Sequence, residues 1–209
     1  MRTKADFDKN KKKYIIQIFQ IFLEEGYEIA TMSSIIKKLG ISKGVFYHYF
    51  ESKEACAREC ANYYAKECVL SIVEQRREYD SMLDAFAECI GLGIKMAKNF
   101  KLHQMNTSTN LIFHQMVMVA LVKEMSVVYE EIFRKGNETN EFHIPFPKET
   151  SEMILTLSQF YMDESFFLWD KEEMNCKSEA LLSLCAQILG TSKEQLIEKI
   201  NQFSKEKIR

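Results

Sequence analysis

Two short helical patterns separated by a tight turn, between Thr31 and Glu54, constrain the fold of this chain more than any other stretch. In the first pattern, apolar residues recur at i, i+3, i+4 and i+7, which places them on one face of a helix. These residues are Met32, Ile35, Ile36 and Leu39. The spacing of the two patterns predicts a helix-turn-helix.

The turn has the chemistry that a tight connection needs. Gly40 can adopt positive φ after the first helix, and Thr31 and Ser42 can cap the two helices. The second helix divides by face. Its inner side is predicted to hold Ile41, Phe46, Tyr49 and Phe50, and its outer side Ser42, Lys43, Gly44, Val45, Tyr47 and His48.

The composition predicts an all-α protein, because the 209 residues include only two prolines and seven glycines, which helix interiors exclude. We expect two helical domains, a smaller one over residues 1–52 that contains the helix-turn-helix and a larger one over 53–209. Gly136 is expected to end a long helix that begins at Leu111. Gly91 and Gly93 should mark a close approach of a neighbouring backbone or of a ligand. Helices are predicted over residues 8–26, 31–39, 42–50, 52–77, 81–100, 111–133, 147–168, 178–189 and 192–203.

Charge is divided unevenly along the chain. Residues 1–53 contain ten Lys and Arg against six Asp and Glu, although the whole chain carries a net charge of −2. A basic segment that flanks a helix-turn-helix pattern indicates nucleic acid as a partner. The lysines between Lys9 and Lys13 leave two interpretations open, a solvated first turn or an arm near DNA phosphates.

The sequence shows no signal peptide and no run of about 18 apolar residues that would span a membrane, so we expect a cytoplasmic protein. Its six cysteines are then expected to be reduced, and their spacings match no redox or zinc pattern. We interpret them as small core residues.

Sequence motifs of the common enzyme classes are absent: H-E-x-x-H, G-x-S-x-G, G-x-x-x-x-G-K-[ST], and G-x-G-x-x-G after a strand. The four histidines are scattered, and no pair has the i, i+4 spacing of a helical metal site. We therefore expect neither an enzyme nor a bound metal or other cofactor.

The outer face of the second short helix carries groups that suit DNA binding. Ser42 and the first backbone amides can meet a phosphate, and Lys43 adds charge that releases counterions. Gly44 removes a side chain where a DNA backbone would press close, and Val45 can present methyl groups to a thymine.

Three further residues extend this face. Tyr47 and His48 can donate hydrogen bonds to phosphate oxygens, which set register without reading sequence. Lys53, at the start of the next helix, is placed to hold the flanking DNA backbone.

The run from Gly40 to Glu54, G-I-S-K-G-V-F-Y-H-Y-F-E-S-K-E, resembles the DNA-binding signature of the TetR-like family of transcriptional repressors. The resemblance implies three N-terminal helices for DNA, a connecting fourth helix, and a C-terminal domain for ligand and dimerisation. The sequence departs from the family at Ser33, where Arg is common, and at Val45, where Thr or Ala is frequent. The resemblance implies DNA contacts at Thr31, Ser33, Ser42, Lys43, Gly44, Val45, Tyr47, His48 and Lys53.

Because two recognition helices must reach successive major grooves, a regulator of this kind should be a homodimer. The last long helices are the expected dimer face, and an intramolecular core is the competing interpretation of their apolar residues. The candidates are Met153, Leu157, Phe160, Tyr161, Phe167, Leu181, Leu184 and Ile188.

The resemblance also implies a cavity between helices of the C-terminal domain. Methionine suits adaptable apolar binding, and the scarcity of charge favours a small hydrophobic effector, although the competing interpretation is again plain core. The candidates are Met96, Phe100, Met105, Phe113, Met116, Met118, Tyr129, Phe166 and Trp169. The expected function is a ligand-responsive repressor, released from a palindromic DNA operator by its effector; the alternative is a helical ligand-binding or adaptor protein without operator function.

Overall fold

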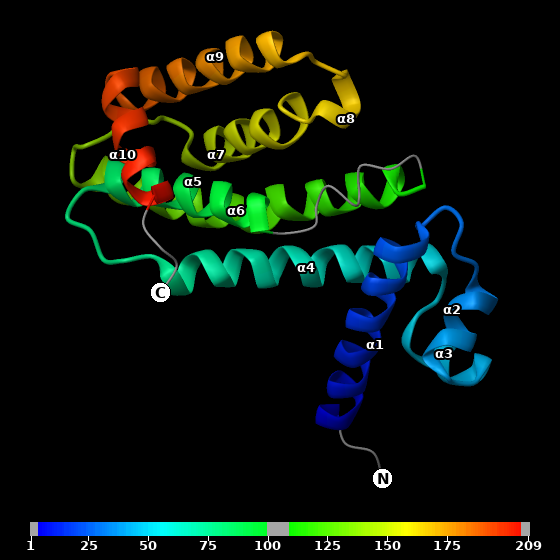
Figure 1. Cartoon of the computed structure of the whole chain (residues 1–209). Coiled ribbons are helices and arrows are strands. Elements are labelled where there is room, and N and C mark those ends of the chain that lie inside the picture. Colours follow the sequence, from blue (N-terminus) through cyan, green and yellow to red (C-terminus); the bar gives the residue numbers. More distant parts are fainter. Residues whose placement is uncertain (1–3, 100–108, 206–209) are drawn as a thin grey trace. The chain divides into compact units, whose positions relative to one another are not determined.

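The computed structural model describes residues 4–99 and 109–205, and this part of the chain consists of helices and their connections, with no strand (Figure 1). The all-α prediction is confirmed. The elements are α1 (Lys4–Glu25), α2 (Met32–Leu39), α3 (Lys43–Tyr49), α4 (Lys53–Gln75), α5 (Met82–Asn99), α6 (Leu111–Glu138), α7 (Pro147–Thr156), the π-helix η2 (Leu157–Tyr161), α8 (Glu164–Phe167), α9 (Lys171–Leu189) and α10 (Lys193–Lys205).

The chain forms two compact units, and each contains parts that are distant in sequence. The N-terminal unit comprises residues 1–67 and 101–120, and the C-terminal unit comprises residues 68–100 and 121–209. This division differs from the single boundary expected after residue 52. The cause is that α4 and α6 each contribute one end to the N-terminal unit and the other end to the C-terminal unit.

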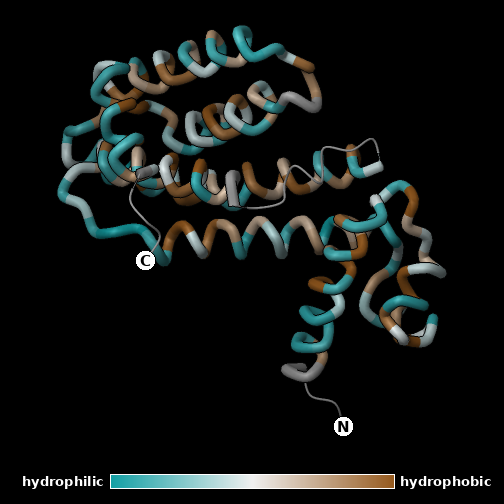
Figure 2. The backbone as a smooth tube through the Cα atoms, in the orientation of Figure 1, coloured by the Kyte–Doolittle hydropathy of each residue, from teal (hydrophilic) through white to brown (hydrophobic). Residues whose placement is uncertain are grey.

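The N-terminal unit is built on the apolar second half of α1. The first turns of this helix are mainly hydrophilic and the later ones are increasingly hydrophobic (Figure 2). Ile18 and Phe22 of α1, Ile35 of α2 and Phe46 of α3 are each fully buried. The amphipathic patterns that predicted these helices therefore do face a common core.

The turn between α2 and α3 follows the predicted chemistry. Gly40 adopts a left-handed conformation with φ of 64°, and its N–H donates to carbonyls of the last turn of α2. Thr31 caps α2, since its Oγ1 accepts a hydrogen bond from Ser34 N at 3.1 Å. Ser34 Oγ in turn accepts from Thr31 N at 3.0 Å, which completes a capping box that the sequence pattern had not indicated.

The C-terminal unit has a second core, formed by α5, α7, α9, α10 and the unit's parts of α4 and α6. Phe86 of α5 contacts Tyr129 and Phe133 of α6, with ring centroids 4.9 and 5.5 Å apart. Helix α10 packs along α5 and against α9. Ser192 caps α10, because its Oγ accepts from Gln195 N at 3.1 Å.

Helix α6 does not end at Gly136, so that expectation was wrong. The helix continues to Glu138, and the glycine serves packing instead of termination. A Cβ on Gly136 would lie 2.1 Å from Cδ2 of Phe142, a buried residue of the following loop. Only a residue without a side chain leaves room for that ring.

The helices predicted over residues 147–168 and 178–189 also differ from those observed. The first is broken into α7, η2 and α8, and Leu168 then adopts a positive φ of 54°. The second begins seven residues earlier than expected, at Lys171. Asp170 caps it, with Oδ1 accepting from the N–H groups of Glu172 and Glu173 at 2.8 and 2.9 Å.

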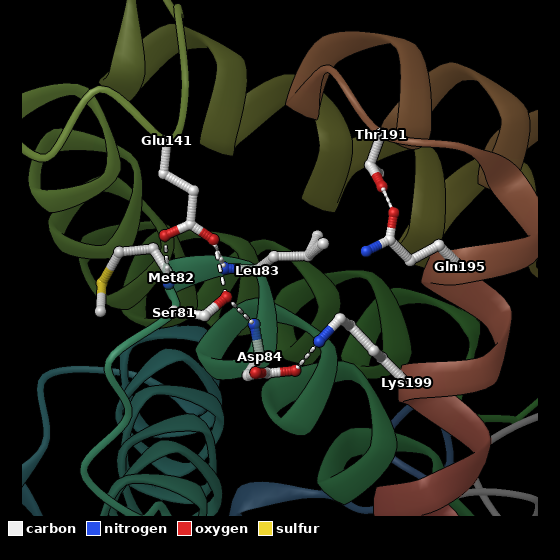
Figure 3. Close-up of polar contacts among 8 residues, drawn as sticks. All are labelled: Ser81, Met82, Leu83, Asp84, Glu141, Thr191, Gln195 and Lys199. Atoms are coloured by element: carbon white, nitrogen blue, oxygen red, sulfur yellow. Dashed lines mark hydrogen bonds and ion pairs between the residues drawn. The ribbon is translucent and has the colours of Figure 1, made fainter.

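The N-terminus of α5 is capped by a residue from a distant loop (Figure 3). The carboxylate of Glu141 accepts hydrogen bonds from Ser81 Oγ, Met82 N and Leu83 N at 2.7, 2.6 and 2.9 Å. Burial of this carboxylate raises its pKa, but the three hydrogen bonds and the charge of Lys199 outweigh that effect, and the pKa is lowered overall. The loop after α6 is thereby attached to the start of α5.

Helix α6 is the one helix of the described part that is long and apolar enough, by length and composition, to cross a membrane. In its most apolar 18-residue window, 44% of the residues are buried within the protein. Val117 and Phe133 on this helix are fully buried. A core helix gives the same pattern, so the feature alone is weak evidence for a membrane span.

Five of the six cysteines are buried, in agreement with their interpretation as small core residues, whereas Cys176 is exposed. Burial raises the pKa of Cys89 to about 12 and that of Cys185 to about 11. Both thiols are therefore protonated and unreactive at neutral pH. Among the described side chains, no group of three or more His, Cys, Asp or Glu residues is placed to hold a metal ion.

The two glycines within α5 have different surroundings, and they provide a matched pair of substitutions. A Cβ on Gly91 would lie 2.9 Å from Cβ of Phe203 and 3.1 Å from N of Ser204 on α10, whereas a Cβ on Gly93 would have nothing within 4 Å. The predicted close approach of a backbone is thus confirmed at Gly91, whereas no described residue approaches Gly93.

We predict that Gly91→Ala destabilises the protein by about 1–3 kcal/mol, because the added methyl group forces α10 away from α5. Gly93→Ala should instead stabilise it by about 0.5–1 kcal/mol, because alanine favours the helix. Urea unfolding followed by circular dichroism measures both changes. A Gly91→Ala variant as stable as Gly93→Ala would contradict the packing of α10 on α5.

Candidate nucleic-acid interface

Helix α3 presents two chemically different faces, as its sequence predicted. Phe46 and Tyr49 are buried, and Phe50, which follows the helix, is also buried. Ile41 and Val45 are intermediate, so Val45 is less accessible than expected. The exposed residues at the start and on the outer side of the helix are Ser42, Lys43, Gly44, Tyr47 and His48.

The first turn of α3 is held by Ser42. This residue has an extended conformation, and its Oγ accepts a hydrogen bond from Val45 N at 3.2 Å. The cap satisfies one backbone donor at the helix start, which would otherwise have no intrahelical partner. It also sets the direction in which Lys43 and Gly44 leave the turn.

Tyr47 and His48 are accessible, but neighbouring groups orient both rings. Tyr47 is 46% exposed, and the Nζ of Lys43 lies 5.9 Å from its ring centroid. The His48 ring meets the edge of Phe7 from α1 at 5.2 Å, and Phe7 stacks on Tyr49 at 4.7 Å. Phe7 was not among the predicted residues; the only signal for it is an isolated aromatic residue within a charged segment.

Gly44 has no role in the packing of the protein itself. A Cβ built at this position would meet only Oγ of Ser42, at 3.9 Å, which is an ordinary van der Waals contact. Its φ is not in the left-handed region that favours glycine. A glycine in a helix costs up to about 1 kcal/mol relative to alanine. The packing and the backbone conformation of the fold therefore do not require a glycine at this exposed position.

Thr31 and Ser33 lie at the start of α2 and are both exposed. The Thr31 hydroxyl already accepts the capping hydrogen bond from Ser34 N. Ser33 directly precedes Ser34 in the sequence and lies in the same turn of α2. The structure thus places both predicted residues at an accessible helix start.

Lys53 lies at the start of α4, as predicted, and its side chain contacts the turn between α1 and α2. Its ammonium group donates hydrogen bonds to the carbonyl oxygens of Tyr27 and Ala30, at 2.8 and 3.0 Å. It also lies 4.4 Å from the centroid of the Tyr27 ring. The carbonyl groups of the turn between α1 and α2 thus lie within reach of the start of α4 and accept hydrogen bonds from Lys53.

Two lysines at the basic start of α1 pair with acidic residues of α4. Lys11 forms an ion pair with Glu59 at 2.7 Å, and Lys12 forms one with Glu67 at 3.5 Å. The hydrogen bond and charge of Tyr63, with the charge of Glu67, raise the pKa of Lys12. Lys11 and Lys12 thus form ion pairs with α4, which neither of the two interpretations had included.

The candidate effector residues that the structure describes are divided between the two units. Phe113, Met116 and Met118 belong to the N-terminal unit. Phe113 is fully buried there, with its ring centroid 5.6 Å from Phe19 and 5.0 Å from Phe22. Phe113 therefore belongs to the core of the N-terminal unit, which the first turns of α6 complete.

The remaining candidates lie in the C-terminal unit or outside the described residues. Tyr129 is buried in the core, where desolvation raises its pKa well above the ordinary value, and Met96 packs against that core. Trp169 donates from Nε1 to the carbonyl oxygen of Tyr161 at 3.0 Å, and Phe166 stacks on Phe160 with centroids 5.8 Å apart. Phe100 and Met105 lie outside the described residues.

The candidate dimer residues fall into two groups. Met153, Tyr161, Phe167 and Leu184 are exposed, with 63, 36, 47 and 40% of their surfaces accessible. Leu181 and Ile188 are partly buried against the core of the same unit, and Leu157 and Phe160 are also half-buried. Leu181 and Ile188 therefore pack in the intramolecular core, whereas partner contact of the four exposed residues stays a prediction.

Comparisons with known proteins agree with this architecture. A family model described as tetR-family bacterial regulatory proteins matches residues 18–60, and one described as the tetracyclin repressor-like C-terminal domain matches residues 94–184. The uncharacterized HTH-type transcriptional regulator YuxN of Bacillus subtilis (strain 168) is 27% identical over 173 residues, which cover 74% of this chain and 55% of that protein. The match thus spans about half the length of this relative.

Solved structures share the fold at low identity. A TetR-family transcriptional regulator from Pectobacterium atrosepticum has a TM-score of 0.66 and 14% identity, covering 91% of this chain and 98% of its own. RolR in complex with resorcinol has a TM-score of 0.65 and 15% identity, covering 99% of each chain.

The two family matches include α2 and α3 at one end and most of the C-terminal unit at the other, and together they cover more than half of the sequence. They coincide with the predicted helix-turn-helix and with the helical domain that follows it. The chain belongs to the TetR family of transcriptional regulators.

Proposed function

We propose that this protein is a ligand-responsive transcriptional regulator that binds DNA through the outer face of α3 and acts in the cytoplasm. It is most simply a repressor that leaves a palindromic operator when a small hydrophobic molecule binds the C-terminal unit. Membership of a family of transcriptional regulators supports this proposal. So does the group of exposed polar residues at the start of α3.

Gly44 is the observation that carries the DNA-binding part of the proposal. The fold has space for a Cβ at this position, and a glycine weakens the helix. An incoming DNA backbone would occupy that space. A close approach to a phosphate also suits the flanking residues, because Ser42 and Lys43 are exposed in the same turn.

The proposed DNA-binding residues are Thr31, Ser33, Ser42, Lys43, Gly44, Val45, Tyr47 and His48. Lys43 supplies the charge that displaces counterions, and the hydroxyl and imidazole groups donate to phosphates. Half-buried Val45 has the least accessible side chain of the residues on α3 in this set. Direct sequence readout therefore rests on few side chains.

A homodimer is part of the proposal, because one helix of seven residues contacts only half of an operator. Exposed apolar residues of α7, η2, α8 and α9 supply a surface that a second copy would cover. Met153, at 63% exposure, and Phe167, at 47%, would gain most from burial.

The effector is proposed to be a small hydrophobic molecule. RolR, which shares the fold, has been solved with resorcinol. Here Met96, Phe166 and Trp169 are the candidates that come from the C-terminal unit without being fully buried in its core. Such a ligand can release DNA only by the difference between its affinities for the DNA-competent and DNA-incompetent states.

Selection from a random pool of DNA duplexes tests the DNA-binding proposal. The wild-type protein should enrich a site with two inverted half-sites, whose centres lie about one helical turn apart. Lys43→Ala should weaken binding and lower the slope of log K against log salt by about 0.9 for each phosphate that the lysine no longer neutralises. Failure to enrich any sequence would contradict the proposal and favour a binding protein without operator function.

Substitution of Gly44 separates the needs of DNA from those of the fold. Gly44→Ala should leave the protein folded and raise its free energy of unfolding by up to about 1 kcal/mol. The same change should weaken binding to the selected site about tenfold, because the methyl group occupies the space proposed for the DNA backbone. Fluorescence anisotropy at constant salt measures the affinity, and undiminished binding would argue against contact at this residue.

Light scattering at micromolar concentration tests the oligomeric state. We expect a mass twice that of the 24.5 kDa chain. Met153→Glu, which places a charge on the proposed contact surface, should shift the protein towards the mass of a single chain. A wild-type protein that is already monomeric would rule out the proposed dimer.

A further inference from the structure

The turn between α1 and α2 is held by side chains and backbone from two other elements of the N-terminal unit. It begins at Gly26, which has a φ of 90°, and a Cβ there would lie 2.5 Å from Cβ of Thr109. The turn therefore presses directly against the residues that precede α6. This contact explains the glycine, both by its conformation and by its lack of space.

The backbone donors of the turn bond to Thr109 and Asn110. Tyr27 N donates to Oδ1 of Asn110 at 2.7 Å, and Glu28 N donates to the carbonyl oxygen of Thr109 at 3.0 Å. Asn110 is buried, with only 1% of its surface exposed. In return, the carboxylate of Glu28 accepts from Ile112 N in the first turn of α6, at 3.0 Å.

The backbone acceptors of the same turn bond to Lys53. The carbonyls of Tyr27 and Ala30 precede the capping residue of α2, so the α2 helix provides no donors for them. The ammonium group supplies two, at 2.8 and 3.0 Å. A lysine in the first turn of a helix lies at the positive end of its macrodipole, which is unfavourable. The two carbonyl oxygens and the Tyr27 ring offset that cost.

We infer that Lys53 is a positioning residue, which acts with Asn110 to hold the α1–α2 turn and, through it, the start of α2 in the orientation that binds DNA. The inference rests on the proposed DNA-binding function. It assigns to Lys53 no contact with a DNA phosphate. Lys53, Thr109 and Asn110 together are called the turn clasp below.

The two possible roles of Lys53 make different predictions about salt. A lysine that neutralises a phosphate weakens binding to all DNA sequences when it is removed, and it lowers the salt dependence. A lysine that orients the helix-turn-helix affects binding to the specific site, because only that site requires the correct geometry. Non-specific binding depends on charge at the surface and should change little.

Lys53→Met is the informative substitution, because it keeps the aliphatic part of the side chain and removes the donors. Lys43→Met on the exposed face of α3 is the matched control. Binding to a duplex selected by the wild-type protein and to a scrambled duplex of equal length is measured over a series of salt concentrations. For Lys53→Met we expect about tenfold weaker specific binding, unchanged non-specific binding and an unchanged salt slope.

The control and the alternatives have distinct outcomes. Lys43→Met should lower the slope of log K against log salt by about 0.9 per phosphate contact, or about 1.8 for a dimer. It should also weaken binding to both duplexes. If Lys53→Met behaves in the same way, or has no effect on either duplex, the inference is overturned while the proposed function stands. If the wild-type protein does not distinguish the two duplexes, the proposed function itself fails.

Hydrogen exchange of the free protein tests the turn clasp without DNA. Lys53→Met and Asn110→Ala should each accelerate exchange of the Tyr27 and Glu28 amides, whereas Lys43→Met should not. Amides in the buried core of the C-terminal unit report whether each variant remains folded. Unchanged exchange at Tyr27 and Glu28 in a folded Lys53→Met variant would also overturn the inference.

Discussion

Helix α3 is seven residues long, and a helix of that length does not persist alone in water because nucleation is unfavourable. Its existence depends on burying Phe46 and Tyr49 against the rest of the N-terminal unit. The same burial determines which residues remain outside. The proposed DNA-binding face is therefore a consequence of core packing, and it needs no stability of its own.

This dependence extends to elements far away in sequence. Phe113, in the first turn of α6, is fully buried among aromatic rings of α1, and Asn110 bonds to the turn after α1. Farther along the same helix, Tyr129 and Phe133 belong to the core of the C-terminal unit. One continuous helix thus contributes to both cores. Under the proposed function, an effector bound in the C-terminal unit would act on a helix that begins directly after two residues of the turn clasp.

Features that depend on neighbouring residues could be predicted from the sequence. The capping residues Thr31 and Ser42, and the left-handed Gly40, follow from local chemistry, and the structure has each of them as expected. The two faces of α3 follow from helical periodicity. The all-α class follows from composition.

Features that depend on distant contacts could not be predicted. Gly136 had the appearance of a helix end, but its role is set by the ring of Phe142. Lys53 was predicted to contact a DNA phosphate because of its place at the start of a helix. In the structure it bonds to carbonyl groups 23 and 26 residues earlier in the chain, and such backbone groups carry no sequence signal. Phe113 had the appearance of a cavity residue, since its apolar pattern does not reveal which core it enters. In each case the local sequence pattern was identified correctly, but the distant residue that it contacts could not be identified from the sequence.

The most direct measurement of the central claim is backbone hydrogen exchange with and without the selected duplex. If the outer face of α3 binds DNA, the duplex should slow exchange at the start of α3, around Lys43 to Val45, and at the start of α2. Protection there, stronger than with the scrambled duplex at the same concentration, is the result that we predict. Protection confined to other elements, with α3 unchanged, would contradict the claim.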